Sequence, residues 1–304
     1  MTIPDIRSLA PMRINTTVIP VAALQVPPEV ATEAFRHSGN EFASALVVPG
    51  AAPRARWRMP AKTAYDLIGL KFLKATVLDL HFAKFIDGIR DNTATHTKYA
   101  LATNAVAMVY IHRFSVADRG IAWADCEAIF LSADGMVHPI AAPTTVALPT
   151  LASQPSLHTA GTAVINTVAV PGSMEAAIEL APQVQVGIDG SPGDGLLYPT
   201  VAAYLGAAPA IEVGHADPIA LLAQLGLTGV AAAGASGFDL WLRDYDSTNQ
   251  VALSTGVRFR IASGRIVPVD FGADTGRVMR SGLRCEGLSG STTHPIAVST
   301  GSVP

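Results

Sequence analysis

Gly50-Ala51-Ala52-Pro53 returns later in the chain as Gly206-Ala207-Ala208-Pro209, and this repeat decides how the rest of the sequence is interpreted. Internal repeats are the first feature to look for, because they set the number of structural units. Further matches follow in the same order: Ile68-Gly69-Leu70 with Leu225-Gly226-Leu227, Leu78-Asp79-Leu80 with Phe238-Asp239-Leu240, and Lys98-Tyr99-Ala100-Leu101-Ala102 with Arg258-Phe259-Arg260-Ile261-Ala262. One fold is therefore expected twice.

The repeat extends in both directions from this stretch. Upstream, the segment from Ile14 to Pro20 matches the segment from Ile165 to Pro171. Downstream, the matches are Cys126-Glu127 with Cys285-Glu286 and His138-Pro139-Ile140-Ala141 with His294-Pro295-Ile296-Ala297. Because the chain has 2 cysteines, one at each matching place, chance similarity is a poor explanation. We expect two tandem homologous domains, residues 1–150 and 151–304.

Composition indicates an assembling protein without a nucleic-acid footprint. Charged residues are 15% of the 304, the net charge is −3 and the mean hydropathy is +0.35. An average globular domain has about 25% charged residues, so the shortage suggests that partners cover much of the surface. The alternative is a bias toward alanine with no assembly. A net negative charge argues against sequence-specific binding to phosphates.

Neither end nor middle of the sequence predicts export or membrane insertion. The stretch from Met1 to Arg13 has no apolar region after a basic start, and no later stretch has about 18 uninterrupted apolar residues. We expect no membrane partner and synthesis in the cytoplasm. The two cysteines, in separate repeats, are expected to be buried small hydrophobes and not a disulfide.

Hydrophobic periodicity predicts a mainly β chain with one short helix in each half. Alternation predicts strands at 50–59, 77–85 and 238–243. Helical spacing from Ala61 to Ile68, ended by Gly69, predicts one amphipathic helix. Asp217 as cap, Pro218 at the first helical position and Gly226 after Leu225 predict its counterpart. Residues 139–155 are expected to be an extended linker, and residues 1–13 an arm.

No group of residues predicts catalysis, a cofactor or a metal. The loop from Asp189 to Gly195 resembles a calcium loop in its two carboxylates and its glycines, but it lacks the alternate oxygen ligands and the closing bidentate glutamate, so a solvated turn is expected. His215 and Asp217 could bind a metal, but Asp217 is already explained as a cap. The Gly-x-Ser-x-Gly motif is incomplete at Ser236 and Ser289. We expect no enzyme: catalytic residues none, cofactor none, metal none.

Two repeated features have structural interpretations. His138 and His294 stand at equivalent places before prolines, where a repeated role at the start of a strand is simpler than two active sites. Cys126 and Cys285 lack the spacing of zinc or thiol sites.

Arg54, Arg56 and Arg58 are the most distinctive charges, because alternation places them on one face of a strand. In the second half the aligned residues are Ala210, Glu212 and Gly214. The change from Arg56 to Glu212 predicts a contact between the first half of one chain and the second half of a neighbour in a ring. The alternative is an edge strand whose arginines discourage aggregation.

These features together resemble the tail tube proteins of long-tailed bacteriophages, in the form with two tube domains in one chain. The resemblance rests on the tandem β-rich halves, each pairing a short helix with alternating strands, on the low charge, on the arm and on the long loop near Asp189. It spans nearly the whole chain, although none of its motifs is diagnostic.

The resemblance implies two β-sandwich or barrel domains, each with a flanking helix, in homotrimeric rings with pseudo-sixfold symmetry. The rings would stack into a tube in the virion tail, assembled in the host cytoplasm. Its partners would be other tail proteins at the tube ends, a tape-measure protein, and genomic DNA passing without specific contacts through an acidic lumen. Alternatives are a distal tail or baseplate ring protein, a capsid decoration protein, and a tandem carbohydrate-binding protein.

Overall fold

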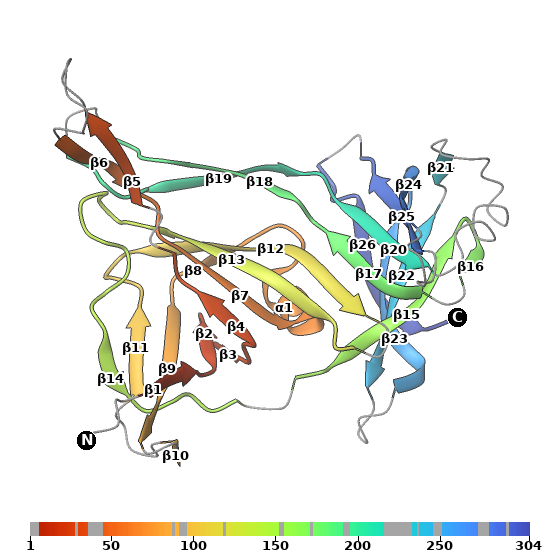
Figure 1. Cartoon of the computed structure of the whole chain (residues 1–304), viewed down its shortest axis with the longest axis horizontal. Coiled ribbons are helices and arrows are strands. Elements are labelled where there is room, and N and C mark those ends of the chain that lie inside the picture. Colours follow the sequence, from red (N-terminus) through yellow and green to blue (C-terminus); the bar gives the residue numbers. More distant parts are fainter. Residues whose placement is uncertain are drawn as a thin grey trace.

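The protein is described by a computed structural model that covers residues 6–27, 30–35, 45–86, 89–90, 96–117, 120–151, 155–170, 173–190, 195–215, 233–235, 237–245, 251–272, 280–289 and 292–304. Within these residues the chain is mainly β, with one helix and strand pairings that are all antiparallel, so the prediction of a mainly β chain is confirmed. Figure 1 shows a broad central sheet with a smaller sheet near each end of the molecule.

A ten-stranded sheet runs through the molecule and takes strands from both halves of the sequence (Figure 1). The order is β21 (Ala233–Ala235), β24 (Gly264–Gly272), β25 (Arg280–Gly287), β20 (Ala210–His215), β17 (Ser173–Glu179), β12 (Val106–Ala117), β13 (Trp123–Leu131), β7 (Arg54–Pro60) and β4 (Ala23–Gln25), with β8 (Leu73–Ala75) beside β12. The halves meet where β12 pairs with β17.

Each half also contributes a smaller sheet. The first contains, in order, β14 (Thr144–Val146), β11 (His96–Ala100), β9 (Leu78–Ile86), β2 (Met12–Ile14) and β3 (Thr17–Ile19), with β1 (Ile6–Leu9) and β10 (Ile89–Arg90) also on β9. The second contains, in order, β26 (Ile296–Ser302), β23 (Val251–Ile261), β22 (Phe238–Tyr245), β15 (His158–Ile165) and β16 (Val168–Val170). Two separate hairpins are β5 (Val30–Phe35) with β6 (Ala45–Ala51), and β18 (Pro182–Gly187) with β19 (Val201–Ala207).

Local pairings recur between the halves. Asn15 and Asn166 adopt φ angles of 51° and 49°, a left-handed conformation in which asparagine is enriched. Over 2.8 Å, Asn15 donates its backbone N–H to the Val77 oxygen and Asn166 donates its own to the Gly237 oxygen. The turns β2–β3 and β15–β16 therefore meet β9 and β22 at matching positions, as the aligned sequences predict.

Helix α1 (Ala61–Ile68) occupies the predicted range and packs against β7, β12 and β13. It buries Ala61, Ala64 and Ile68, and Gly69 ends it with a φ of 75° and an N–H bond to the Tyr65 oxygen. A positive φ is accessible to glycine at no steric cost, which explains the stop. The counterpart helix predicted from Asp217 to Leu225 lies outside the described residues.

Two expectations about chain segments are wrong. Residues 1–13 were expected to form an arm, but Ile6–Leu9 and Met12–Ile14 pair with β9 inside a sheet, where Met12 and Ile14 are buried in the core. Residues 1–5 lie outside the described residues. Residues 139–155 were expected to be a linker, yet Thr144–Val146 pairs with β11. The expected strand at 50–59 is also interrupted, because β6 ends at Ala51 and β7 begins after Pro53, which has no N–H to give a ladder.

One contiguous core joins the halves. Alternation along β7 buries Ala55, Trp57 and Met59, and the core cluster continues into the second half. There Phe114 and Phe259 pack with their ring centroids 5.2 Å apart. Burying such a side chain contributes roughly 1.5–3 kcal/mol, so the halves stabilise each other. A domain boundary near residue 150 stays a prediction.

Candidate assembly interface

The face of the ten-stranded sheet that points away from the core carries a network of ion pairs. Arg54 and Arg56 contact Glu127 at 2.6 and 2.9 Å, and Arg58 contacts Asp125 at 2.8 Å. In the second half, Arg284 lies 2.8 Å from Glu179, 3.5 Å from Glu212 and 3.6 Å from Glu286. The arginines named here therefore have their carboxylates within the same chain.

Glu127 is the centre of this network in the first half. Its side chain is buried, at 2% exposure, and it accepts hydrogen bonds from Arg54, Arg56 and the Tyr110 hydroxyl, with the His112 ring nitrogen 2.9 Å away. Burial alone would raise its pKa, but the bonds from His112, Arg54 and Arg56 outweigh burial and lower the pKa to about 2. Burial and the Glu127 charge raise the pKa of Tyr110 above its ordinary value. Glu127 is therefore a carboxylate that stabilises the sheet.

Strand register corrects the predicted reversal of charge. Cys126 lies opposite Trp57, and Cys285 lies opposite Ile211. The next pair along each ladder is Arg58 with Asp125 in the first half and Glu212 with Arg284 in the second. Glu212 therefore matches Arg58 and not Arg56, and the two halves exchange the signs of one ion pair within the chain. The expected Arg56 to Glu212 contact between chains loses its basis.

The junction between the halves is an antiparallel pairing of β12 with β17. The residues from Arg113 to Ala117 lie opposite those from Glu179 to Glu175, and the Leu180 N–H donates to the His112 oxygen over 2.9 Å. On the core side Phe114, Val116, Ala176 and Ile178 are buried. The junction therefore combines a backbone ladder with an apolar core.

The same two kinds of edge recur at the outer limits of this sheet. In the first half β4 holds the place that β17 holds in the second half, because β4 pairs with β7 as β17 pairs with β20. In the second half β24 holds the place that β12 holds in the first half, because β24 pairs with β25 as β12 pairs with β13. Within the part of the chain that the structure describes, no further strand pairs with the outer edge of β4 or with the edge of β24 from Val267 to Gly272. The molecule therefore presents, on opposite sides, the two edges that pair at its own internal junction.

The hairpin β18–β19 reaches back from the second half over the first (Figure 1). Val184, Val186, Ala202 and Tyr204 pack on a cluster formed by Met108, Tyr110, Ile129 and Leu131. Beyond β18 the Leu197 N–H donates to the Gly135 oxygen, and the Leu197 oxygen accepts from Ala51, both over 2.8 Å. The hairpin thus covers apolar side chains that would otherwise be exposed.

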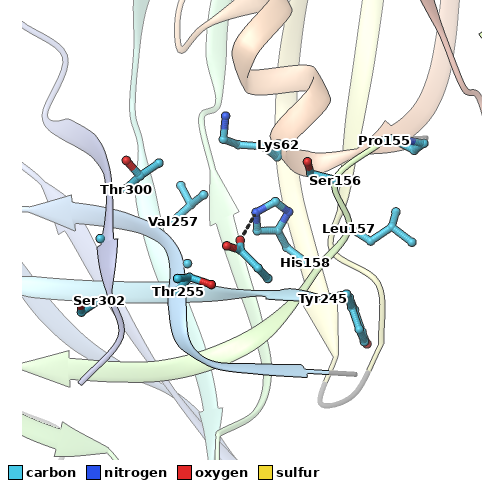
Figure 2. A pocket seen from close by; sticks show the side chains of 13 residues that line it. Lys62, Pro155, Ser156, Leu157, His158, Tyr245, Thr255, Val257, Thr300 and Ser302 are labelled. Carbon is cyan, nitrogen blue, oxygen red and sulfur yellow. Dashed lines mark ion pairs between the residues drawn. The ribbon is translucent and has the colours of Figure 1, made fainter. Parts of the chain in front are cut away.

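A cavity of about 780 Å³ lies where α1 meets the second half, lined by Lys62, Pro155, Ser156, Leu157, His158, Asp244, Tyr245, Thr255, Gly256, Val257, Thr300, Gly301 and Ser302. Figure 2 shows His158 at its wall, joined to Asp244 by an ion pair of 2.7 Å. His158 is 3% exposed. Burial lowers the pKa of His158, and the Asp244 charge opposes this change without cancelling it.

We expect Asp244→Asn to lower the pKa of His158 further, because the one carboxylate that favours the charged ring is removed. An NMR titration of the ring would measure the shift. Because the folded pKa lies below the ordinary value of 6.5, His158 disfavours the folded state as the pH falls below 6.5. Thr255→Ala, which changes the cavity but no charge, is the control, and an unchanged His158 pKa in Asp244→Asn would contradict the prediction.

The residues weighed as chemical sites have structural surroundings. The ring nitrogens of His138 and His294 accept from the Ile140 and Ile296 N–H groups, both over 3.1 Å, which is the same local contact in each half. Burial raises the pKa of Cys126 well above its ordinary value and that of Cys285 to about 12. Both are free and buried, so the prediction of buried small hydrophobes is confirmed.

Other candidate positions are only partly described. The Asp189 N–H donates to the Thr200 hydroxyl over 2.7 Å, while 191–194 lies outside the described residues, as do Asp217 and Ser236. His215 ends β20. Sequence reasoning missed Glu127 and His158. Alternation offered a signal for Glu127, because a strand with three arginines on one face needs carboxylates on its neighbour.

Metal-binding clusters and membrane-spanning helices are both absent from the described part of the chain. It contains no group of three or more histidine, cysteine, aspartate or glutamate side chains arranged to hold a metal ion. No helix in this part is long and apolar enough to cross a membrane.

No protein-family model matches the chain, and a search of curated proteins finds no match either.

Proposed function

We propose that this chain is a structural subunit that assembles head to tail into rings, and that these rings form the tail tube of a long-tailed bacteriophage. The observation that carries the proposal is the β12–β17 junction. This junction joins two similar units in one sheet. The outer edge of β24 corresponds to the edge of β12 at the junction, and the outer edge of β4 corresponds to the edge of β17. The chain is in this view a two-unit segment of a longer array.

The shared strand order supports an internal duplication. The smaller sheets run β14-β11-β9-β2-β3 and β26-β23-β22-β15-β16, and within the large sheet β4-β7-β13-β12 has the order of β17-β20-β25-β24. In both smaller sheets the matched residues share one register, with Tyr99 opposite Leu80 and Phe259 opposite Leu240. We infer two tandem homologous β domains with their boundary close to residue 150.

A head-to-tail contact generates a closed ring when its rotation closes, and otherwise an open filament. Three chains of two units each would give a ring with pseudo-sixfold symmetry. We assign the charged face of the ten-stranded sheet, where the hairpin β18–β19 leaves it uncovered, to the lumen, because the main core and the smaller sheets occupy the other face. Arginines that are paired with carboxylates, such as Arg58 with Asp125, offer DNA phosphates little free positive charge. That suits a conduit through which the genome slides during ejection.

Negative-stain electron microscopy with the solution mass of the same sample tests this function. We expect trimers that form rings or stacked tubes about 100 Å across, the scale of six domains of this size. Isolated rings that never stack would favour a distal tail or baseplate ring, and binding of single copies to capsids would favour a decoration protein. A stable monomer at high concentration would contradict the proposal, and a glycan screen for carbohydrate binding would follow.

A further inference from the structure

The two separate hairpins have the same register. In β5–β6, Val30 lies opposite Ala51 and Ala31 lies opposite Gly50, after which the register shifts. In β18–β19, Pro182 lies opposite Ala207 and Gln183 lies opposite Gly206, and the register shifts at the same place. Each hairpin leads directly into a strand of the large sheet, β7 or β20. The hairpins therefore hold equivalent places in the two halves.

Packing on the chain's own surface is described for the hairpin β18–β19. The hairpin β18–β19 packs on the cluster around Ile129. Within the described residues, β5 and β6 pair only with each other. The Ala51 N–H bond to Leu197 connects the base of β5–β6 to the chain, and Val30 at that base is 46% exposed. The hairpin projects at the edge of the molecule (Figure 1).

The position that would match Ile129 lies in the second half and is exposed. Ile129 stands three residues after Cys126, and Leu288 stands three residues after Cys285, the cysteine at the same ladder position. Ile129 is 0% exposed beneath the hairpin β18–β19, whereas Leu288 is 63% exposed. Within the described residues, β5–β6 therefore pairs with no other strand, and Leu288 is an exposed apolar residue at the position that the hairpin β18–β19 covers in the first half.

The free edge of β24 gives a second reason for an additional contact. Pro268 lies opposite Leu283 of β25, and a proline inside a ladder places its nitrogen away from the paired strand. When the two strands are matched through Cys126 and Cys285, Pro268 of β24 corresponds to Phe114 of β12. Phe114 belongs to the segment of β12 that pairs with β17. A junction between β24 and a neighbour's β4 therefore lacks one N–H that the internal junction has, so it needs more contact from other elements.

We propose that the hairpin β5–β6 is an intersubunit arm that lies over the second half of a neighbouring copy of this chain and covers Leu288. The inference rests on the head-to-tail assembly proposed above. The internal junction gives the direction. There the hairpin β18–β19 of the second half covers the first half, and β12 of the first half pairs with β17 of the second half. The arm of a chain therefore covers the neighbour whose β24 meets its β4.

Cysteine cross-linking tests the arm. Val48 stands two residues before Gly50, as Tyr204 stands two residues before Gly206, so Val48 is the arm position that matches Tyr204. The chain with both Val48→Cys and Leu288→Cys should form covalent dimers and trimers with a short bismaleimide. The two single variants, when mixed, should give dimers only, and each single variant alone should stay uncross-linked. The native cysteines are both buried, and the wild-type chain controls for them.

An intrachain pair provides a positive control. Tyr204→Cys with Ile129→Cys, oxidised to a disulfide so that no reagent has to enter the buried site at Ile129, should cross-link within one chain and keep the mass of a monomer. Rings that are seen by microscopy but fail to cross-link through Val48→Cys and Leu288→Cys would overturn the arm and leave the proposed function standing. A chain that forms neither rings nor cross-links would contradict both. Cross-links at these positions in assembled rings would support the arm.

Discussion

Replacing Leu24 with proline is expected to convert assembled rings into single chains while each chain stays folded. The Pro27 oxygen accepts from the Arg54 N–H over 3.3 Å. Backbone groups alternate in direction along a strand, so Gln25 also faces β7 and Leu24 faces the free edge. Proline at Leu24 removes a donor only from that edge and places its ring against the incoming strand. A lost hydrogen bond with this clash should weaken association by about tenfold or more.

Leu24→Ala is the matched control for that variant. Leu24 also packs against the core, so both variants lose apolar contact, but alanine keeps the N–H. Sedimentation velocity should find Leu24→Ala assembled and Leu24→Pro monomeric, and circular dichroism should find both folded. Unaltered rings in Leu24→Pro would show that β4 is not the edge that closes the ring.

Replacing Glu127 with alanine is expected to lower the free energy of unfolding by about 1–3 kcal/mol, because a buried carboxylate that accepts several hydrogen bonds is removed while its arginines keep part of their solvent contact. Glu127 is buried beneath Arg54 and Arg56 and accepts the Tyr110 hydroxyl over 3.0 Å. Without this carboxylate the two guanidinium groups repel each other and Tyr110 loses its acceptor. Denaturant unfolding, followed by tryptophan fluorescence, measures the loss.

Asp125→Asn on the same strand is the control, because its pair with Arg58 is exposed on both sides, at 38% and 46%. Exposed pairs contribute about 0–1 kcal/mol, so the change should be small. Equal losses in Glu127→Ala and Asp125→Asn would contradict the role assigned to burial.

The stability of the wild-type chain should also depend on Glu127 in acid. Its pKa is lowered from 4.5 to about 2 in the folded state. Its contribution is therefore complete above pH 4.5 and is lost as the pH falls toward 2. Glu127→Gln should remove this part of the acid dependence, and an unchanged acid profile in that variant would argue that other carboxylates cause it.

Arg56→Glu would be the direct test of the contact between Arg56 and Glu212 of neighbouring chains that the aligned sequences predict, but we expect it to destabilise the fold instead. Arg56 contacts Glu127 at 2.9 Å within its own chain, so the substitution places two carboxylates together and destabilises the sheet. A fall in assembly would then report on folding. The match of Gly50–Pro53 with Gly206–Pro209 aligns Arg56 with Glu212. The strand pairing around Cys126 and Cys285 aligns Arg58 with Glu212 instead, two residues further along β7.

Several local elements of this protein could be predicted from the sequence alone. Alternation along Arg54–Pro60 separated arginines from core residues, helical spacing ended by Gly69 located α1, and ordered matches such as Cys126 with Cys285 aligned the halves. These features depend on side-chain period and backbone angles within a few residues. They can therefore be read without knowing what lies across the sheet.

The pairing of strands from different parts of the chain could not be predicted in this way. The junction of β12 with β17, the burial of Glu127 and the placement of β18–β19 over Ile129 all join residues far apart in the sequence. A register shift between Ile111 and Arg113 changes which residues of β12 face β13. Because side chains alternate with a period of two, one extra residue reverses every face beyond it. That is why the ion pairs and the free edges could not be assigned before the sheet was known.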